Sequence, residues 1–407
     1  MANTDVPKLP LAALWVSAFR PFCALGAAYG VVLMTLWTAS RVAPVALPSG
    51  ALPPALWHAH EMLFGFAVAI ICATVLTALP GWAGTPEVAG APLAGLVALW
   101  LAGRVLAWSG DVVPAVLAGV PDAALYAVLI ARLAPQLGRL RNRRYLSLLV
   151  VLAGLFAGEV FFAAGRRETG FMLALYAVLL VFALKAGVLT PVFTGNHLRA
   201  QRRGDQARFV PPLEYAAIAS IVVLAALDLA HAPARWQGVA ALAAFALHAI
   251  RFLRWQGWKV LDAPMLATMH AGYAWMLAAL LLLALGDFGV EAAARAWLHA
   301  FTVGALGSMM LGLMTRIALR HTGRPLVLPA PMVAAYALLQ LAAVLRVGAA
   351  LVPSGEAIVV VAGTAWVAAF ATYLACFGPM LVTPSLPRVQ VSPLAADAAP
   401  PPGAASR

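Results

Sequence analysis

Long uninterrupted apolar runs divide the chain, and apolar positions do not alternate with polar ones within them. Each run approaches the roughly 20 residues that an α-helix needs to cross a bilayer. A transmembrane β-barrel would instead show segments of about 10 residues with alternating hydrophobicity. The pattern therefore predicts an all-α polytopic membrane protein with about twelve transmembrane helices. The runs cover 22–40, 62–80, 91–109, 112–132, 146–165, 170–190, 213–230, 236–253, 264–285, 297–318, 330–352 and 356–378.

These runs predict a simple division of the chain. Residues 1–21 are expected to be a cytoplasmic N-terminal segment, and residues 22–380 a twelve-helix transmembrane domain. Residues 381–407 are rich in Pro, Ala and Ser and have no hydrophobic periodicity. Such composition cannot bury enough apolar surface to fold, so a disordered cytoplasmic tail is expected there.

Composition supports the membrane interpretation. Of 407 residues, 63% are apolar and only 10% are charged, whereas soluble domains have about 45–50% apolar and about 25% charged residues. The lipid bilayer is thus the expected partner. A net charge of +12 would suggest nucleic acid in a soluble protein. Here the basic residues concentrate in alternate connections, including 132–144, 199–208 and 316–324, as the positive-inside rule requires. Both termini are therefore predicted to be cytoplasmic, and no nucleic-acid partner is expected.

The twelve runs also form two sets of six that would both start in the cytoplasm, which raises the alternative of a parallel six-plus-six repeat. Trp57-His58-Ala59-His60 opens the second run, and Gly65 follows His60 by five residues. Trp297-Leu298-His299 opens the tenth run, and Gly304 follows His299 by five residues. This similarity is short, and chance explains it as well as duplication does.

Three histidines, His58, His60 and His299, are expected at the outer mouths of the second and tenth runs. Imidazole is a common ligand of haem iron and copper, and helix bundles often build cofactor sites from two facing helices. His58 and His60 are two residues apart, so on a regular helix they point about 200° apart. Both can bind one metal ion only if the helix starts after His58. Otherwise one histidine faces a site within the bundle, and the other faces water or a second site. The competing interpretation is that these histidines hydrogen-bond to headgroups and water at the interface.

Charged residues within the apolar runs are further candidates for binding a cofactor. Arg104, Glu159 and Arg346 fall in the outer third, at the depth of His60 and His299, and each costs at least about 2.5 kcal/mol to insert. We expect an arginine there to pair with Glu159 or to hold a carboxylate such as a haem propionate. The alternative is that it extends to the outer interface.

A second set of candidates lies toward the cytoplasm. His270 follows Met269 and Met265, whose thioethers would suit Cu(I), although packing in an apolar helix also explains them. His321 follows the tenth run in a basic stretch that also suits an inner anchor. The candidate cofactor-binding residues are therefore His58, His60, His299, Arg104 and Arg346, and the candidate metal ligands are His58, His60, His299, His270 and His321.

Five sequence blocks stand out together. They are Ala18-Phe19-Arg20-Pro21-Phe22, the segment from Trp57 to Phe66, the segment from Leu76 to Gly84, Met314-Thr315-Arg316, and His321-Thr322-Gly323-Arg324-Pro325. With these blocks the chain resembles the NnrS family of bacterial inner-membrane proteins. The resemblance implies about twelve helices, a place in the inner membrane, non-covalent b-type haem and copper as cofactors, and a role in nitric oxide metabolism and nitrosative stress during denitrification. It does not transfer the family's metal ligands residue by residue.

Three functional hypotheses follow. The first is a haem- and copper-associated membrane protein of the nitric oxide response, and the second is a transporter of a small molecule or metal that uses membrane histidines. The third is a membrane oxidoreductase acting on nitric oxide. Haem-copper oxidases and nitric oxide reductases take haem ligands from their second and tenth helices and copper ligands from the sixth and seventh. Runs 170–190 and 213–230 contain no histidine, which argues against the third hypothesis and leaves enzymatic activity open.

Overall fold

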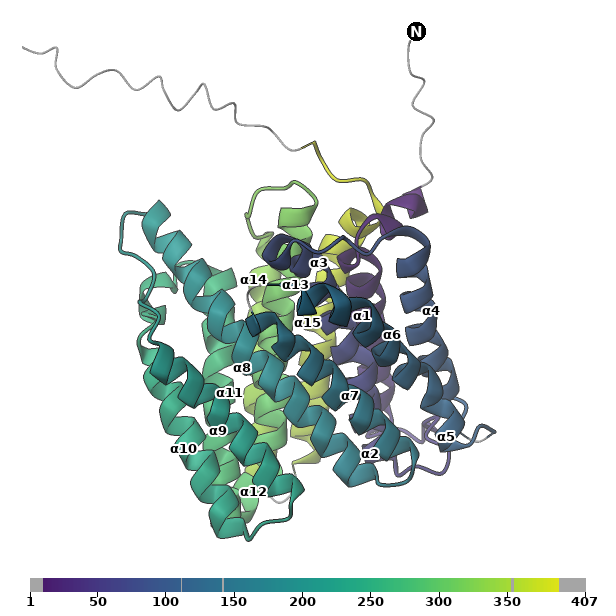
Figure 1. The fold of residues 1–407 in the computed structure, drawn as a ribbon. Helices are drawn as coiled ribbons and strands as arrows, with labels where there is room; N and C mark the ends of the chain where they lie inside the picture. The colour runs from purple at the N-terminus through teal and green to yellow at the C-terminus, as the bar shows by residue number, and fades with distance from the viewer. Residues whose placement is uncertain (1–9, 111, 141–142, 353–354, 388–407) are drawn as a thin grey trace, which may run out of the picture.

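The computed structural model describes residues 10–110, 112–140, 143–352 and 355–387, which form a bundle of helices without any strand in these ranges (Figure 1). Eleven helices within them are long and apolar enough to cross a membrane. This confirms the predicted all-α polytopic membrane protein. The expected tail lies mostly outside the described residues, and the division into three segments stays a prediction.

The helices follow one another with short connections. In the first half they are η1 (Pro10–Val16), α1 (Phe19–Ala39), α2 (Pro54–His60), η2 (Glu61–Ala67), α3 (Val68–Ala83), α4 (Gly90–Ala107), α5 (Ala115–Ala118), α6 (Val120–Gly138), η3 (Arg143–Leu146) and α7 (Ser147–Ala163). In the second half they are α8 (Arg167–Ala200), α9 (Pro211–Leu229), α10 (Ala234–Leu253), η4 (Gly257–Val260), α11 (Pro264–Asp287), α12 (Glu291–His299), η5 (Ala300–Gly307), α13 (Ser308–His321), α14 (Ala330–Gly348), η6 (Ala349–Leu351) and α15 (Glu356–Val382).

Every predicted run corresponds to a helix, but several boundaries differ. The run expected at 62–80 belongs to a continuous helix that starts at Pro54, and the run at 297–318 belongs to one from Glu291 to His321. The helix α8 continues ten residues past the expected end at 190. The run at 146–165 corresponds to α7, which has only 17 residues and is shorter than the eleven spans.

The two composite helices, α2–η2–α3 and α12–η5–α13, are the most deeply buried spans. The pairs α9–α10 and α4–α6 lie on opposite sides of the bundle, and α1 packs against α15 (Figure 1). We call the end that holds α2, α5 and α12 the distal end. The opposite end, with η1 and the last turn of α15, is the proximal end (Figure 1).

Arg20 joins the first and last spans at the proximal end. Its guanidinium donates hydrogen bonds to the backbone oxygens of Met380 (3.2 Å), Leu381 (2.8 Å) and Thr383 (2.6 Å), and to the hydroxyl of Ser385 (2.8 Å). The carbonyls at the end of a helix have no partner within the helix and carry partial negative charge. A buried arginine there satisfies three of them at once, which gives Arg20 a structural role within its sequence block.

Small residues let α7 approach α8 closely. A Cβ atom added at Gly158 would lie 2.8 Å from the backbone oxygen of Gly170, and one at Gly170 would lie 2.5 Å from the backbone oxygen of Gly158. One turn away, a Cβ atom at Gly154 would lie 2.9 Å from that of Ala177. Small residues at such spacing are typical of tightly packed transmembrane helices. This contact fixes α7, and therefore Glu159, against the rest of the bundle.

Candidate functional site

His60 and His299 occupy equivalent places in the two composite helices. Each is the last residue of an α-helix that continues as a π-helical segment, η2 after His60 and η5 after His299. Segments of π-helix are rare and frequently occur at functional sites. Their presence at the two positions that the sequence similarity singled out is consistent with the repeat hypothesis, which otherwise stays untested.

A glycine in each π-helical segment packs against a tryptophan. A Cβ atom at Gly304 would lie 2.5 Å from the indole of Trp275. At Gly65 a Cβ atom would lie 2.7 Å from the ring of Tyr29, and the Gly65 carbonyl accepts a 2.9 Å hydrogen bond from the indole of Trp100. Trp275 and Tyr29 occupy the space that a side chain at Gly304 or Gly65 would need. The two glycines therefore allow the neighbouring helices to approach closely.

A cavity of about 320 Å³ opens near the distal end, and both His58 and His299 line it. The His58 ring stacks on Trp37 of α1, with ring centroids 4.3 Å apart. The Nδ1 atoms of His58 and His299 are buried and have no hydrogen-bond partner in the described structure. A buried polar atom without a partner is costly, so each ring lacks one hydrogen bond that its surroundings would normally supply. The two imidazole side chains come from different helices, α2 and α12, and line the same cavity, which makes this cavity a candidate ligand site.

The remaining wall of this cavity is largely apolar, with two basic groups. Met62, Phe66 and Trp366 contribute apolar surface, while Arg41 and Arg346 contribute guanidinium groups. Arg41 forms a bidentate ion pair with Glu356, whose carboxylate raises the pKa of Arg41 and keeps it cationic. The cavity thus combines two imidazoles, apolar walls and positive charge.

This combination fits haem. Imidazoles from two different helices can serve as axial ligands, apolar and aromatic side chains suit the flat macrocycle, and arginine binds carboxylates such as the propionates in a directed way. The donor set also includes the thioether of Met62, a soft ligand of the kind that Cu(I) accepts. The cavity residues therefore fit the cofactors that the family resemblance implies.

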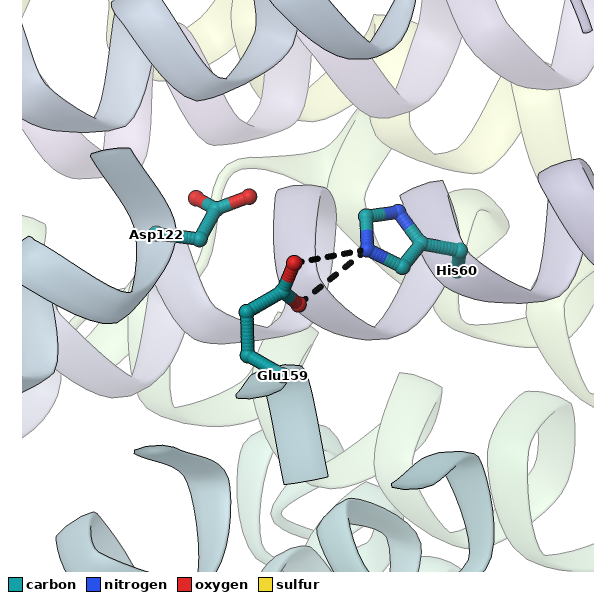
Figure 2. A group of neighbouring side chains, drawn as sticks. All are labelled: His60, Asp122 and Glu159. Atoms are coloured by element: carbon teal, nitrogen blue, oxygen red, sulfur yellow. Dashed lines mark hydrogen bonds and ion pairs between the residues drawn. The ribbon is translucent and has the colours of Figure 1, made fainter. Parts of the chain in front are cut away.

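His60 does not face this cavity. Its Nδ1 lies 2.8 Å from a carboxylate oxygen of Glu61, and its Nε2 lies 3.1 Å from Glu159 (Figure 2). His58 and His60 therefore face two different sites, as expected for a regular helix that has already begun before His58. The structure brings His299 together with His58, the alternative partner, rather than with His60.

Arg104 also differs from its expected role. Its guanidinium pairs with Glu61, at 2.6 Å, and with Asp122 rather than with Glu159 or with the cavity of His58. Tyr29 donates its hydroxyl hydrogen bond to the second oxygen of Glu61 and accepts one from the indole of Trp108. Helices α1, α2, α4, α6 and α7 thus meet at one buried polar cluster.

Asp122 is the functional candidate that the sequence interpretation missed. It lies inside the run 112–132 and is almost completely buried. A carboxylate in an apolar run is as costly as the arginines that were singled out, so the signal was present in the sequence. Glu61 was noted only as part of a motif, although it contacts both His60 and Arg104.

The two proximal candidates, His270 and His321, lie apart from both of these sites. His270 Nε2 lies 2.9 Å from the hydroxyl of Thr194, and the ring packs beside Phe252. His321 ends α13 and packs against the ring of Phe19. Met269 and Met265 are buried in the core.

The fold and the cavity define a multi-pass helical membrane protein with paired histidines at a cavity near the distal end of the bundle. Residues 13–385 match the family described as NnrS protein, and the chain belongs to this family. Membership confirms the resemblance found in the sequence blocks and supports an association with the nitric oxide response. No curated protein matches the chain.

Proposed function

We propose that this protein is an inner-membrane haem protein of the nitric oxide response, and that His58 and His299 hold the haem. The observation that carries this proposal is that imidazole side chains from two different helices, α2 and α12, line one largely apolar cavity. Arg41 and Arg346 would bind the propionates at the same end. Bound haem would supply an iron atom that binds nitric oxide.

The surrounding residues would orient these ligands. Stacking on Trp37 holds the His58 ring in one plane, and Glu356 fixes the Arg41 guanidinium. The apolar walls exclude water from the cavity, which favours non-covalent binding of an apolar macrocycle. Copper remains a second proposed cofactor, with Met62 at this cavity and His270 with its neighbouring methionines as the two candidate sites.

Replacing either cavity histidine should change the haem spectrum. We expect purified protein from haem-supplied cells to show a Soret band with a low-spin, six-coordinate signature. His58→Ala or His299→Ala should lose haem or convert it to a high-spin form, because one axial ligand is missing. Absorption and electron paramagnetic resonance spectra of the purified variants measure this change.

His231→Ala is the matched control, because this histidine lies exposed in the loop between α9 and α10. It should leave the spectrum unchanged. If the protein stays colourless with haem supplied, the haem proposal fails and the transporter hypothesis takes its place. If His58→Ala and His299→Ala keep an unchanged spectrum while His270→Ala or His321→Ala loses it, the haem lies at the proximal end.

The orientation in the inner membrane is a further proposal, with both termini in the cytoplasm. A reporter enzyme that is active only outside the cytoplasm should be active when fused after Arg41, Gly110 or Pro233. The same reporter fused after Arg203 or His321 should be silent, because those connections carry the basic residues. Activity after Arg203 would reverse the orientation and place the cavity of His58 on the cytoplasmic side.

A further inference from the structure

We propose that His60, Asp122 and Glu159 form a binding site for a divalent transition-metal ion, separate from the cavity of His58 and His299. One ligand atom from each residue lies within 4.8 Å of those from the other two. The three side chains come from α2, α6 and α7 and converge in the interior of the bundle (Figure 2). The proposal does not depend on haem binding.

The spacing of the ligand atoms suits a metal ion. Two donor atoms about 2.0–2.2 Å from one ion, at angles near 90–110°, lie roughly 3.0–3.5 Å apart. His60 Nε2 lies 3.1 Å from one oxygen of Glu159 and 3.5 Å from the other. Very little movement would therefore place both groups on a shared ion.

Glu61 orients His60 for such a role. With its proton on Nδ1, the His60 ring donates to Glu61 at 2.8 Å, which leaves the lone pair of Nε2 directed at Glu159. Metal-binding histidines commonly donate their other ring N–H to a carboxylate in this way. An Nε2 lone pair facing a carboxylate is repulsive unless a proton or a metal cation lies between them, and in the proposed site the metal ion takes that place.

Asp122 provides independent support for a ligand. Its side chain is only 1% exposed, one oxygen pairs with Arg104, and the other, Oδ1, is buried and has no hydrogen-bond partner among the described residues. Buried carboxylate oxygens normally accept several hydrogen bonds. An ion bound to Asp122 would satisfy the group that the protein leaves unpaired.

Two glycines make room for the carboxylates. A Cβ atom at Gly103 would lie 2.5 Å from Asp122 Oδ1, and one at Gly119 would lie 2.8 Å from an oxygen of Glu159. A second cavity, of about 150 Å³, is lined by His60 and Glu159 and by the distal loop residues Ser49 and Gly110. This cavity gives an ion arriving from the distal end access to two of its three ligands.

The charge of the cluster is compatible with a bound divalent cation. Three carboxylates, Glu61, Asp122 and Glu159, are joined by hydrogen bonds and ion pairs to one permanent cation, Arg104, and to His60. With His60 neutral, as a metal ligand must be, the group carries two excess negative charges. Buried charge without compensation is strongly unfavourable. A divalent ion neutralises the cluster.

The donor set indicates which ions would bind. One imidazole and two carboxylates suit Mn(II), Fe(II) or Zn(II), whereas Cu(I) prefers the thiolates and thioethers that this site lacks. The site therefore belongs to a different class from a copper site built on methionine.

Mn(II) binding to the full-length protein in detergent tests the proposal. After removal of metals with a chelator, electron paramagnetic resonance of added Mn(II) should show one bound ion per chain. Pulsed measurements should show one directly bound imidazole nitrogen, which His60→Gln should remove. Asp122→Asn and Glu159→Gln each delete a direct ligand, so we expect their Kd for Mn(II) to rise about 100-fold or more, beyond the roughly 10–100-fold typical of outer partners.

Glu291→Gln is the matched control, because this carboxylate lies exposed at the start of α12, and its Kd should equal that of the unchanged protein. Size-exclusion elution and circular dichroism show which variants are folded, and the Kd for Mn(II) is compared only among folded variants. The proposal is overturned if the unchanged protein binds no Mn(II) or Zn(II) at millimolar concentration, or if folded Asp122→Asn and Glu159→Gln both bind as tightly as the control. These outcomes are independent of the haem spectrum.

Discussion

Replacing Arg104 by methionine is expected to destabilise the protein more than any other single change in the polar cluster. The substitution removes the cation that pairs with both Glu61 and Asp122 and leaves two buried carboxylates without it. Removing one partner of a buried ion pair typically costs about 3–5 kcal/mol. Native proteins are stable by only about 5–15 kcal/mol, so a large fraction of the free energy of unfolding should be lost. Unfolding of the purified protein in increasing sodium dodecyl sulfate measures the change.

A second substitution tests whether Asp122 is an ion-pair partner of Arg104. Adding Asp122→Asn to Arg104→Met should recover part of the loss, because the unpaired negative charge disappears. Strictly additive losses would show that Arg104 and Asp122 do not interact. Arg235→Met, at an exposed position near the start of α10, should change stability by no more than about 0.5 kcal/mol.

Replacing Gly170 by valine should force α7 away from α8. The new Cβ atom would lie 2.5 Å from both the backbone oxygen of Gly158 and the backbone nitrogen of Phe162. Backbone atoms cannot move aside as a side-chain end can, so we expect a loss at or above the roughly 1–3 kcal/mol typical of overpacking. The unfolding midpoint in sodium dodecyl sulfate should fall.

Gly95→Val on α4 provides the matched control, because a Cβ atom there meets nothing within 4 Å. Both substitutions add the same β-branched side chain to a helix, so the difference between them isolates the α7–α8 contact. Equal midpoints for the two variants would mean that α7 is not held by this glycine packing.

Hydrophobicity alone predicted the fold well, because each span must be apolar over the thickness of the bilayer. Hydrophobicity could not predict at which residues the helices begin and end. The helix α8 runs to Ala200, and α2 begins at Pro54, and both extensions pack against the bundle, with Leu198 and Trp57 buried. The π-helical segments were also beyond prediction. They accompany the close packing of Gly65 and Gly304 against neighbouring aromatic rings, which is a tertiary effect.

The candidate site was predictable in part. Helical periodicity offered opposite directions for His58 and His60 as one of two alternatives, and the structure shows this one. The cost of burying charge drew attention to Arg104 and Glu159, which are both buried. The partners could not be inferred, because pairing depends on which helices are neighbours in space. Asp122 could have been predicted, because a carboxylate within an apolar run is as costly to bury as an arginine, but the sequence interpretation did not include it.

The hydrogen bonds of Arg20 have a consequence for biosynthesis. Arg20 emerges from the ribosome about 360 residues before its carbonyl partners Met380, Leu381 and Thr383. Throughout the synthesis of the intervening helices this arginine lacks the acceptors that it has in the finished protein. A chain that stops just before Met380 keeps that unpaired charge, although it still contains most of α15. Complete and truncated chains therefore differ at one position that a membrane quality-control protease could distinguish.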